Sequence, residues 1–160
     1  MKRIGFAVVF FLLASAAVAQ GGPSFRGWGF RAGISDRPDQ FIFGAQADFG
    51  ELFENLAFIP NVELGVGDDQ NILSITAPVF YRWPEAGPFD FYAGGGISTG
   101  FVDRDEADEP GEDDGVEVAI APMIAAGLAW PIGKGSEGAV ELAATAGELQ
   151  NLKLVFRYMF

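Results

Sequence analysis

Carboxylate side chains are the residues of this sequence that could do chemistry. Among its 160 residues the chain has 22 Asp and Glu against 10 Lys and Arg, and it has neither histidine nor cysteine. Two carboxylates held close together can act as general acid and general base, and Glu63, Glu117 and Glu141 are the candidates for such a pair. The favoured alternative is that these glutamates form structural ion pairs. Their partners would then be Arg31, Arg82 and Arg157.

A second group of carboxylates is contiguous in the sequence. The segment 103–114 has eight Asp or Glu residues and one Arg, and carboxylate oxygens are ligands that calcium prefers. The spacing does not match a complete EF-hand loop. The favoured alternative is therefore a solvated loop, and we predict no cofactor and no other metal site. The candidate calcium ligands are Asp103, Asp105, Asp108, Glu112, Asp113 and Asp114.

The overall composition excludes other classes of function. The formal net charge of −12 at pH 7 repels nucleic acid, and no basic patch opposes that repulsion. Because the chain has no cysteine, its fold must be stable without disulfides. The run Gly94-Gly95-Gly96 lies within an expected strand, where glycine indicates a bend or a close backbone approach rather than a phosphate-binding loop.

Residues 1–19 have the pattern of a secretory signal peptide. Two basic residues precede an apolar run over residues 4–13, and Ala17-Val18-Ala19 has the small-x-small pattern that signal peptidase reads. We therefore expect cleavage after Ala19 and a single mature domain over residues 20–160. The alternative, a retained membrane helix, calls for a longer apolar run and a basic stop-transfer segment.

The elements that must position the charged side chains are β-strands. After the signal segment, apolar and polar residues alternate with a period of two, and no useful length has helical spacing. Turn-forming residues such as Asp36-Arg37-Pro38-Asp39 separate the alternating stretches. Each stretch is close to, or slightly above, the nine to eleven residues that a tilted strand needs to cross a bilayer. The expected strands span residues 25–35, 40–50, 56–67, 71–83, 89–102, 115–130, 138–147 and 151–160.

Each expected strand has one apolar face and one face of small, polar and charged residues. A membrane barrel turns the apolar face toward lipid, whereas a soluble lipocalin-like barrel turns it inward around a small apolar ligand. We favour the membrane barrel, because glycine and other small residues suit a crowded lumen and the few charges would solvate an outer surface poorly. The charges expected to form ion pairs in the lumen are Arg31, Asp48, Glu63, Arg82, Glu117, Glu141, Lys153 and Arg157.

The fold class that follows is all-β: an eight-stranded antiparallel up-and-down transmembrane β-barrel after the signal peptide. An even strand count returns the C-terminus to the periplasmic side. Trp28, Trp83 and Trp130 then lie at one level, as in the aromatic girdles of membrane barrels. The other aromatic residues expected at this periplasmic rim are Tyr81, Phe89, Phe91 and Tyr158. The loops expected on the opposite side are 36–39, 68–70, 103–114 and 148–150.

The last nine residues alternate apolar and polar side chains and end on Phe160. They resemble the terminal signature of bacterial outer-membrane barrels, whose final aromatic residues, here Tyr158 and Phe160, are recognised by the barrel-assembly machinery. The sequence departs from that signature at Val155, where glycine is frequent. Other stretches, including Pro38-Asp39-Gln40-Phe41, resemble small outer-membrane β-barrel domain proteins that are distant in sequence from the eight-stranded OmpA and OmpX type.

The resemblance implies an outer-membrane location but no particular activity. Outer-membrane enzymes such as lipid A deacylases, palmitoyltransferases and omptin proteases need an active-site histidine, which this chain lacks. We therefore expect a non-enzymatic barrel with an envelope-structural or surface-interaction role. The alternatives are the soluble lipocalin-like barrel and a narrow channel. The expected partners are outer-membrane lipid and the barrel-assembly machinery, without nucleic acid, and the oligomeric state stays open.

Overall fold

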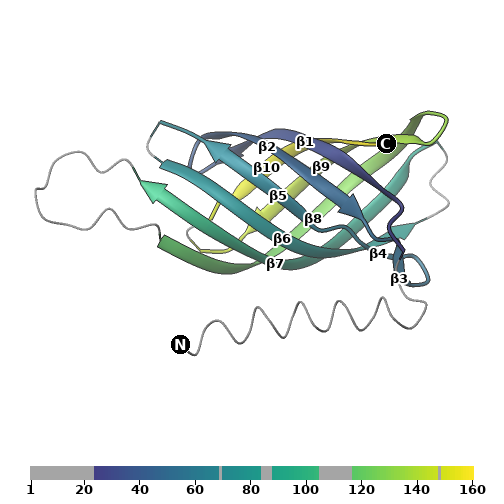
Figure 1. Ribbon diagram of the computed structural model, residues 1–160, viewed down its shortest axis with the longest axis horizontal. Coiled ribbons are helices and arrows are strands. Elements are labelled where there is room, and N and C mark those ends of the chain that lie inside the picture. The colour runs from purple at the N-terminus through teal and green to yellow at the C-terminus, as the bar shows by residue number, and fades with distance from the viewer. Residues whose placement is uncertain (1–23, 69, 84–87, 105–116, 148) are drawn as a thin grey trace, which may run out of the picture.

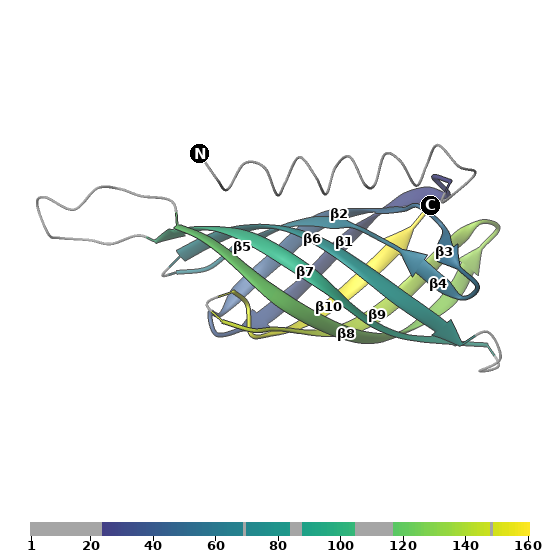
Figure 2. The same ribbon diagram turned by 90° about the horizontal axis from the view of Figure 1, so that it is seen from below.

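The protein folds into a ring of tilted antiparallel β-strands, seen from the side in Figure 1 and after a quarter turn in Figure 2. The computed structural model describes residues 24–68, 70–83, 88–104, 117–147 and 149–160, so the predicted signal peptide lies outside these ranges. The strands are β1 (Gly27–Asp36), β2 (Gln40–Asp48), β3 (Glu51–Phe53), β4 (Leu56–Phe58), β5 (Asn61–Val66), β6 (Gln70–Trp83), β7 (Asp90–Arg104), β8 (Glu117–Gly133), β9 (Ser136–Thr145) and β10 (Leu152–Met159).

Eight of these strands close the barrel, in the order β1–β2–β5–β6–β7–β8–β9–β10, and β10 pairs back onto β1. The short strands β3 and β4 form a hairpin that continues β2 and β5, because β4 pairs with β6 just as β5 does. Gly50 lies between β2 and β3 and interrupts that strand with φ +76°, a backbone conformation that glycine adopts without strain. Pro60 lies between β4 and β5 and interrupts that strand, because proline has no amide hydrogen to donate. The eight-stranded antiparallel barrel predicted from the sequence is confirmed.

The two ends of the barrel differ in their connections. The chain enters β1 and leaves β10 at one end, which also has the β3–β4 and β8–β9 hairpins, and we call it the terminal rim. The other end has the β1–β2, β5–β6, β7–β8 and β9–β10 connections, and we call it the loop rim. Trp28, Trp83 and Trp130 all lie toward the terminal rim, on β1, β6 and β8.

The outer face of the barrel is apolar. Along β10, outward residues such as Leu154 (48% exposed) alternate with inward residues such as Val155 (0%). Other residues of this strand, such as Val155, Phe156 and Tyr158, are β-branched or aromatic and favour an extended backbone. The soluble lipocalin-like alternative required the apolar face to line the lumen, and the structure places that face on the outside. No helix among the described residues is long and apolar enough to cross a membrane.

The lumen is filled with side chains rather than open. Toward the loop rim, Ile72, Val102, Ala121 and Leu149 form a small apolar cluster. A second apolar cluster contains Phe80 and Tyr92 and extends toward the terminal rim, where alanine residues such as Ala129 and Ala139 leave room for the two rings. Phe80 and Tyr92 meet edge to face, with ring centroids 5.2 Å apart. The remaining space holds charged side chains from the middle of several strands.

Candidate functional site: a buried charge network

Arg31 of β1 is the centre of a buried charge network. Its Nε atom lies 2.6 Å from Glu63 Oε1 on β5, and its Nη2 atom lies 2.8 Å from Glu141 Oε1 on β9. Its Nη1 atom donates a hydrogen bond of 3.1 Å to Gln46 Oε1 on β2. One planar guanidinium therefore connects four strands across the lumen, a geometry that the rigid fork of arginine permits and lysine does not.

The last strand, β10, contributes the two other cations of the network. Lys153 Nζ lies 2.6 Å from Glu63 Oε2, and Arg157 Nη1 lies 2.8 Å from Glu141 Oε2. Tyr92 donates a further hydrogen bond, of 3.1 Å, from its hydroxyl to Glu141 Oε2. Each carboxylate therefore faces two cations, one from β1 and one from β10.

The network has one more positive charge than negative charge. Its three cations and two carboxylates are at most 3% exposed, and buried ions are costly unless they are paired. The guanidinium of Arg157 also lies over two aromatic rings, 5.0 Å from the centroid of Tyr92 and 5.7 Å from that of Phe80. The negative face of these rings attracts a cation and partly compensates for the missing counter-charge.

Glu63 and Glu141 lie in ion pairs, the arrangement that the sequence favoured over an acid–base pair. Glu63 and Glu141 both pair with the guanidinium of Arg31, and both are 0% exposed. Neither carboxylate is in contact with solvent, and each is held by two cations. Glu117, the third candidate, lies at the exposed start of β8, and the structure does not bring it to the other two.

Two of the other predicted lumen charges, those of Asp48 and Arg82, lie at the terminal rim. Arg82 lies 3.8 Å from Asp48 and 3.3 Å from Glu137, measured between guanidinium nitrogen and carboxylate oxygen, and its side chain is 27% exposed. Sequence reasoning did not find Glu137, although it has the same parity as Glu141 on β9 and was therefore detectable. Gln46, Phe80 and Tyr92 also lie on inward-facing positions and were missed because they carry no charge.

Most of the candidate calcium segment lies outside the described residues. Of the six proposed ligands only Asp103 is described, and it is exposed at the end of β7. Within the described ranges, no group of three or more Asp or Glu side chains is placed to hold a metal ion.

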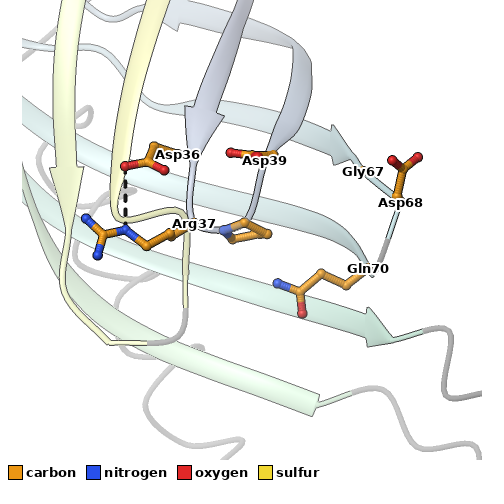
Figure 3. A pocket seen from close by; sticks show the side chains of 7 residues that line it. Asp36, Arg37, Asp39, Gly67, Asp68 and Gln70 are labelled. Carbon is orange, nitrogen blue, oxygen red and sulfur yellow. Dashed lines mark ion pairs between the residues drawn. The ribbon is translucent and has the colours of Figure 1, made fainter.

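The loop rim has an open hollow of about 340 Å³ between the β1–β2 and β5–β6 connections. Figure 3 shows its side chains, with Asp36 paired to Arg37 at 3.5 Å and Asp39 and Asp68 farther apart along the rim. Asp36, Asp39 and Asp68 are all exposed. The described part of this rim is therefore acidic and solvated.

The terminal rim has three groups of aromatic contacts among the described residues. Trp28 stacks on Phe160 with centroids 4.7 Å apart, which joins the first and last strands of the barrel. Trp83 lies 5.0 Å from Phe91 and 4.8 Å from Tyr81. Further ring contacts join Phe89 to Trp130, Trp130 to Phe156 and Tyr158 to Phe160.

Comparison with solved structures shows which known folds this barrel resembles. The N-terminal β-barrel domain of Pseudomonas aeruginosa OprF matches with a TM-score of 0.64 at 12% identity, over 84% of this chain and 98% of that domain. Neisserial surface protein A (NspA) matches with a TM-score of 0.61 at 13% identity, over 83% of this chain and 93% of that one. At the level of fold, this confirms the resemblance to small outer-membrane barrels. Comparisons with protein-family models and with curated proteins gave no match.

Proposed function

We propose that the chain is a non-enzymatic β-barrel of a bacterial outer membrane, with an envelope-structural or surface-interaction role. The observation that carries the proposal is the apolar outer face around a filled lumen. Along the middle of the barrel, side chains such as Ile75, Ile124 and Leu142 are 49–69% exposed. A soluble monomer does not expose such a large continuous apolar surface, because contact with water would make it aggregate.

The aromatic rim supports an orientation in that membrane. Tryptophan and tyrosine side chains prefer the bilayer interface, where one end of the ring is apolar and the other is wet. Ring contacts such as that between Trp28 and Phe160 concentrate at the terminal rim, which the proposal assigns to the periplasm. The acidic loop rim then faces outward, where its carboxylates are available to ions, lipid headgroups or another surface.

The proposal includes two partners. The apolar outer face of the barrel, which we call the apolar belt, has outer-membrane lipid as its partner. The barrel-assembly machinery is the second, acting on the terminal strand through Tyr158 and Phe160, which are in ring contact at 4.9 Å. Removal of residues 1–19 by signal peptidase precedes both interactions.

A pair of arginine substitutions tests the membrane face. Ile75 (49% exposed) lies in the middle of β6, and Ile132 (48%) lies on β8 beyond the level of Trp130. In a bilayer, Ile75→Arg places a charge near the midplane and is expected to cost about 2–4 kcal/mol, whereas Ile132→Arg lies at the interface and is expected to cost about 0–1 kcal/mol. The free energy of unfolding from lipid vesicles, measured in urea, gives both values.

Two readouts in cells accompany this comparison. The wild-type chain and Ile132→Arg are expected in the carbonate-resistant membrane pellet, with heat-modifiable migration in gels, while Ile75→Arg is depleted from that pellet. If carbonate or salt releases the wild-type chain without detergent, the protein is not an integral membrane protein. Equal stability of the two arginine variants would show that the belt does not contact lipid.

A further inference from the structure

Leu149 and Gln150 belong to the connection between β9 and β10, yet they are among the most buried residues of the barrel. Leu149 is 2% exposed and Gln150 is 1% exposed. The sequence predicted a loop over 148–150 on the side opposite the C-terminus, and the two described residues of that loop do lie at the loop rim, but their burial was not predicted. Instead of extending away from the loop rim, both side chains turn into the lumen.

Leu149 fits a seat made by three strands. It packs with Ile72 of β6, Val102 of β7 and Ala121 of β8, the apolar cluster at the loop rim. Gly100 of β7 is the floor of this seat, since a Cβ atom on that residue would lie only 2.2 Å from Leu149 Cδ2. A side chain at position 100 and the leucine cannot both occupy the lumen, because packed interiors do not tolerate that approach.

Gln150 extends the contact to the opposite wall. Its Nε2 atom donates to Gln40 Oε1 of β2 at 2.8 Å, and Gln40 Nε2 donates to the backbone oxygen of Gln70 on β6 at 2.8 Å. Gly65 of β5 again leaves the necessary space, because a Cβ atom there would lie 2.4 Å from Gln150 Nε2. Leu149 and Gln150 together therefore contact five strands around the loop rim.

We infer that Leu149 and Gln150 form a cap that closes the loop end of the lumen to water and small solutes, separately from the charge network beneath it. Both residues lie outside the strand ladder, so displacing them breaks no strand pairing. Lifting the cap would expose a shallow chamber lined by Ser74 and floored by Glu63 and Lys153. The charge network would still close the lumen below that chamber.

Cysteine accessibility tests the cap, because the chain has no cysteine of its own. Ser74→Cys places a reporter at a residue that is 1% exposed and pairs with Gly100 in the β6–β7 register. Ala139→Cys places a second reporter at a residue that is also 1% exposed but lies in the other apolar cluster, toward the terminal rim. The rate of modification by a small methanethiosulfonate reagent is measured for each in detergent micelles.

The cap is then displaced by two independent substitutions. Leu149→Gly removes the capping side chain, and Gly100→Val displaces it from below, whereas Leu149→Met preserves an apolar cap as the matched control. We expect both displacing substitutions to raise the labelling rate of Ser74→Cys by at least about tenfold and to leave that of Ala139→Cys unchanged. Leu149→Met should leave both rates unchanged.

Two results would overturn the inference. If Ser74→Cys is labelled equally fast with and without the cap, Leu149 does not seal the lumen. If removal of the cap raises the labelling of Ala139→Cys as much as that of Ser74→Cys, the cap and the charge network are not separate barriers. Heat-modifiable migration of each variant verifies that the barrel is folded. Because the measurement is made in micelles, it does not depend on whether the proposed membrane location holds.

Discussion

Glu141 shows how the structure uses a charge that cannot reach water. The carboxylate is 0% exposed and accepts contacts from Arg31, Arg157 and Tyr92. These partners come from β1, β10 and β7, so a single glutamate on β9 fixes the relative positions of four strands. Glu141 stabilises the barrel by pairing, because Arg31 and Arg157 would be costly to bury without a counter-charge.

Neutralising Glu141 should therefore destabilise the barrel strongly. Glu141→Gln removes the negative charge from between two guanidiniums, and breaking a buried ion pair in this way is expected to cost about 3–5 kcal/mol. Glu137→Gln is the matched control on the same strand, since the side chain of Glu137 is 25% exposed and pairs with Arg82, and an ion pair open to solvent contributes about 0–1 kcal/mol. Urea unfolding in lipid vesicles measures both. Equal stability of the two variants would contradict a stabilising role for the network.

At the scale of the element, β10 has three separate tasks. Its outward face continues the apolar belt, its inward face supplies Lys153 and Arg157 to the network, and its backbone closes the ring against β1. The residue after it, Phe160, stacks on Trp28 of β1 and lies 5.8 Å from the ring of Phe30. The pairing of β1 with β10, which we call the closing seam, therefore ends in an aromatic cluster at the terminal rim.

Removing this cluster should weaken closure of the barrel. Phe160→Ala loses the ring contacts with Trp28, Phe30 and Tyr158, and aromatic pairs contribute about 0.5–1.5 kcal/mol each. We expect a loss of about 1–3 kcal/mol in unfolding free energy and slower appearance of the heat-modifiable form in vesicles. Phe53→Ala, on the β3–β4 hairpin at 75% exposure, removes the same side chain away from the seam and should change neither measurement appreciably. The opposite order of effects would show that Phe160 does not stabilise the seam.

At the scale of the whole molecule, three features close the lumen. The cap lies at the loop rim, the charge network spans the middle of the barrel, and the cluster around Phe80 and Tyr92 extends toward the terminal rim. Eight-stranded barrels have an interior just wide enough for side chains to fill. The outer face and the lumen therefore differ: the outer face is apolar, which supports the proposed contact with lipid, and the lumen is filled by side chains.

This closure predicts that the protein does not conduct ions. In planar bilayers the wild-type barrel is expected to give a current indistinguishable from that of the empty membrane, because no continuous aqueous path crosses the packed interior. Leu149→Gly should behave in the same way, since the charge network remains in place. Stable, stepwise conductance from the wild-type protein would instead support the narrow-channel alternative.

The sequence by itself determined the strands and their two faces. Period-two alternation fixes which side of a strand each residue occupies, so parity placed Arg31, Glu63 and Lys153 on the polar face. The small residues on that face then indicated that it faces inward. The number of strands and the shared level of the three tryptophans followed from the same pattern and from the turns between strands. These are local properties, because a residue and its neighbours in the chain are enough to specify them.

Only the tertiary structure decided which residues meet across the lumen. Arg31 and Glu141 are 110 positions apart in the sequence, and their contact depends on the register of every pairing between β1 and β9. Glu117 has the correct parity but lies at the exposed end of its strand, so parity could not separate it from Glu141. Leu149 and Gln150 show no alternation that predicts burial. Their seats exist because Gly100 and Gly65, on distant strands, leave space that is visible only once the barrel is closed.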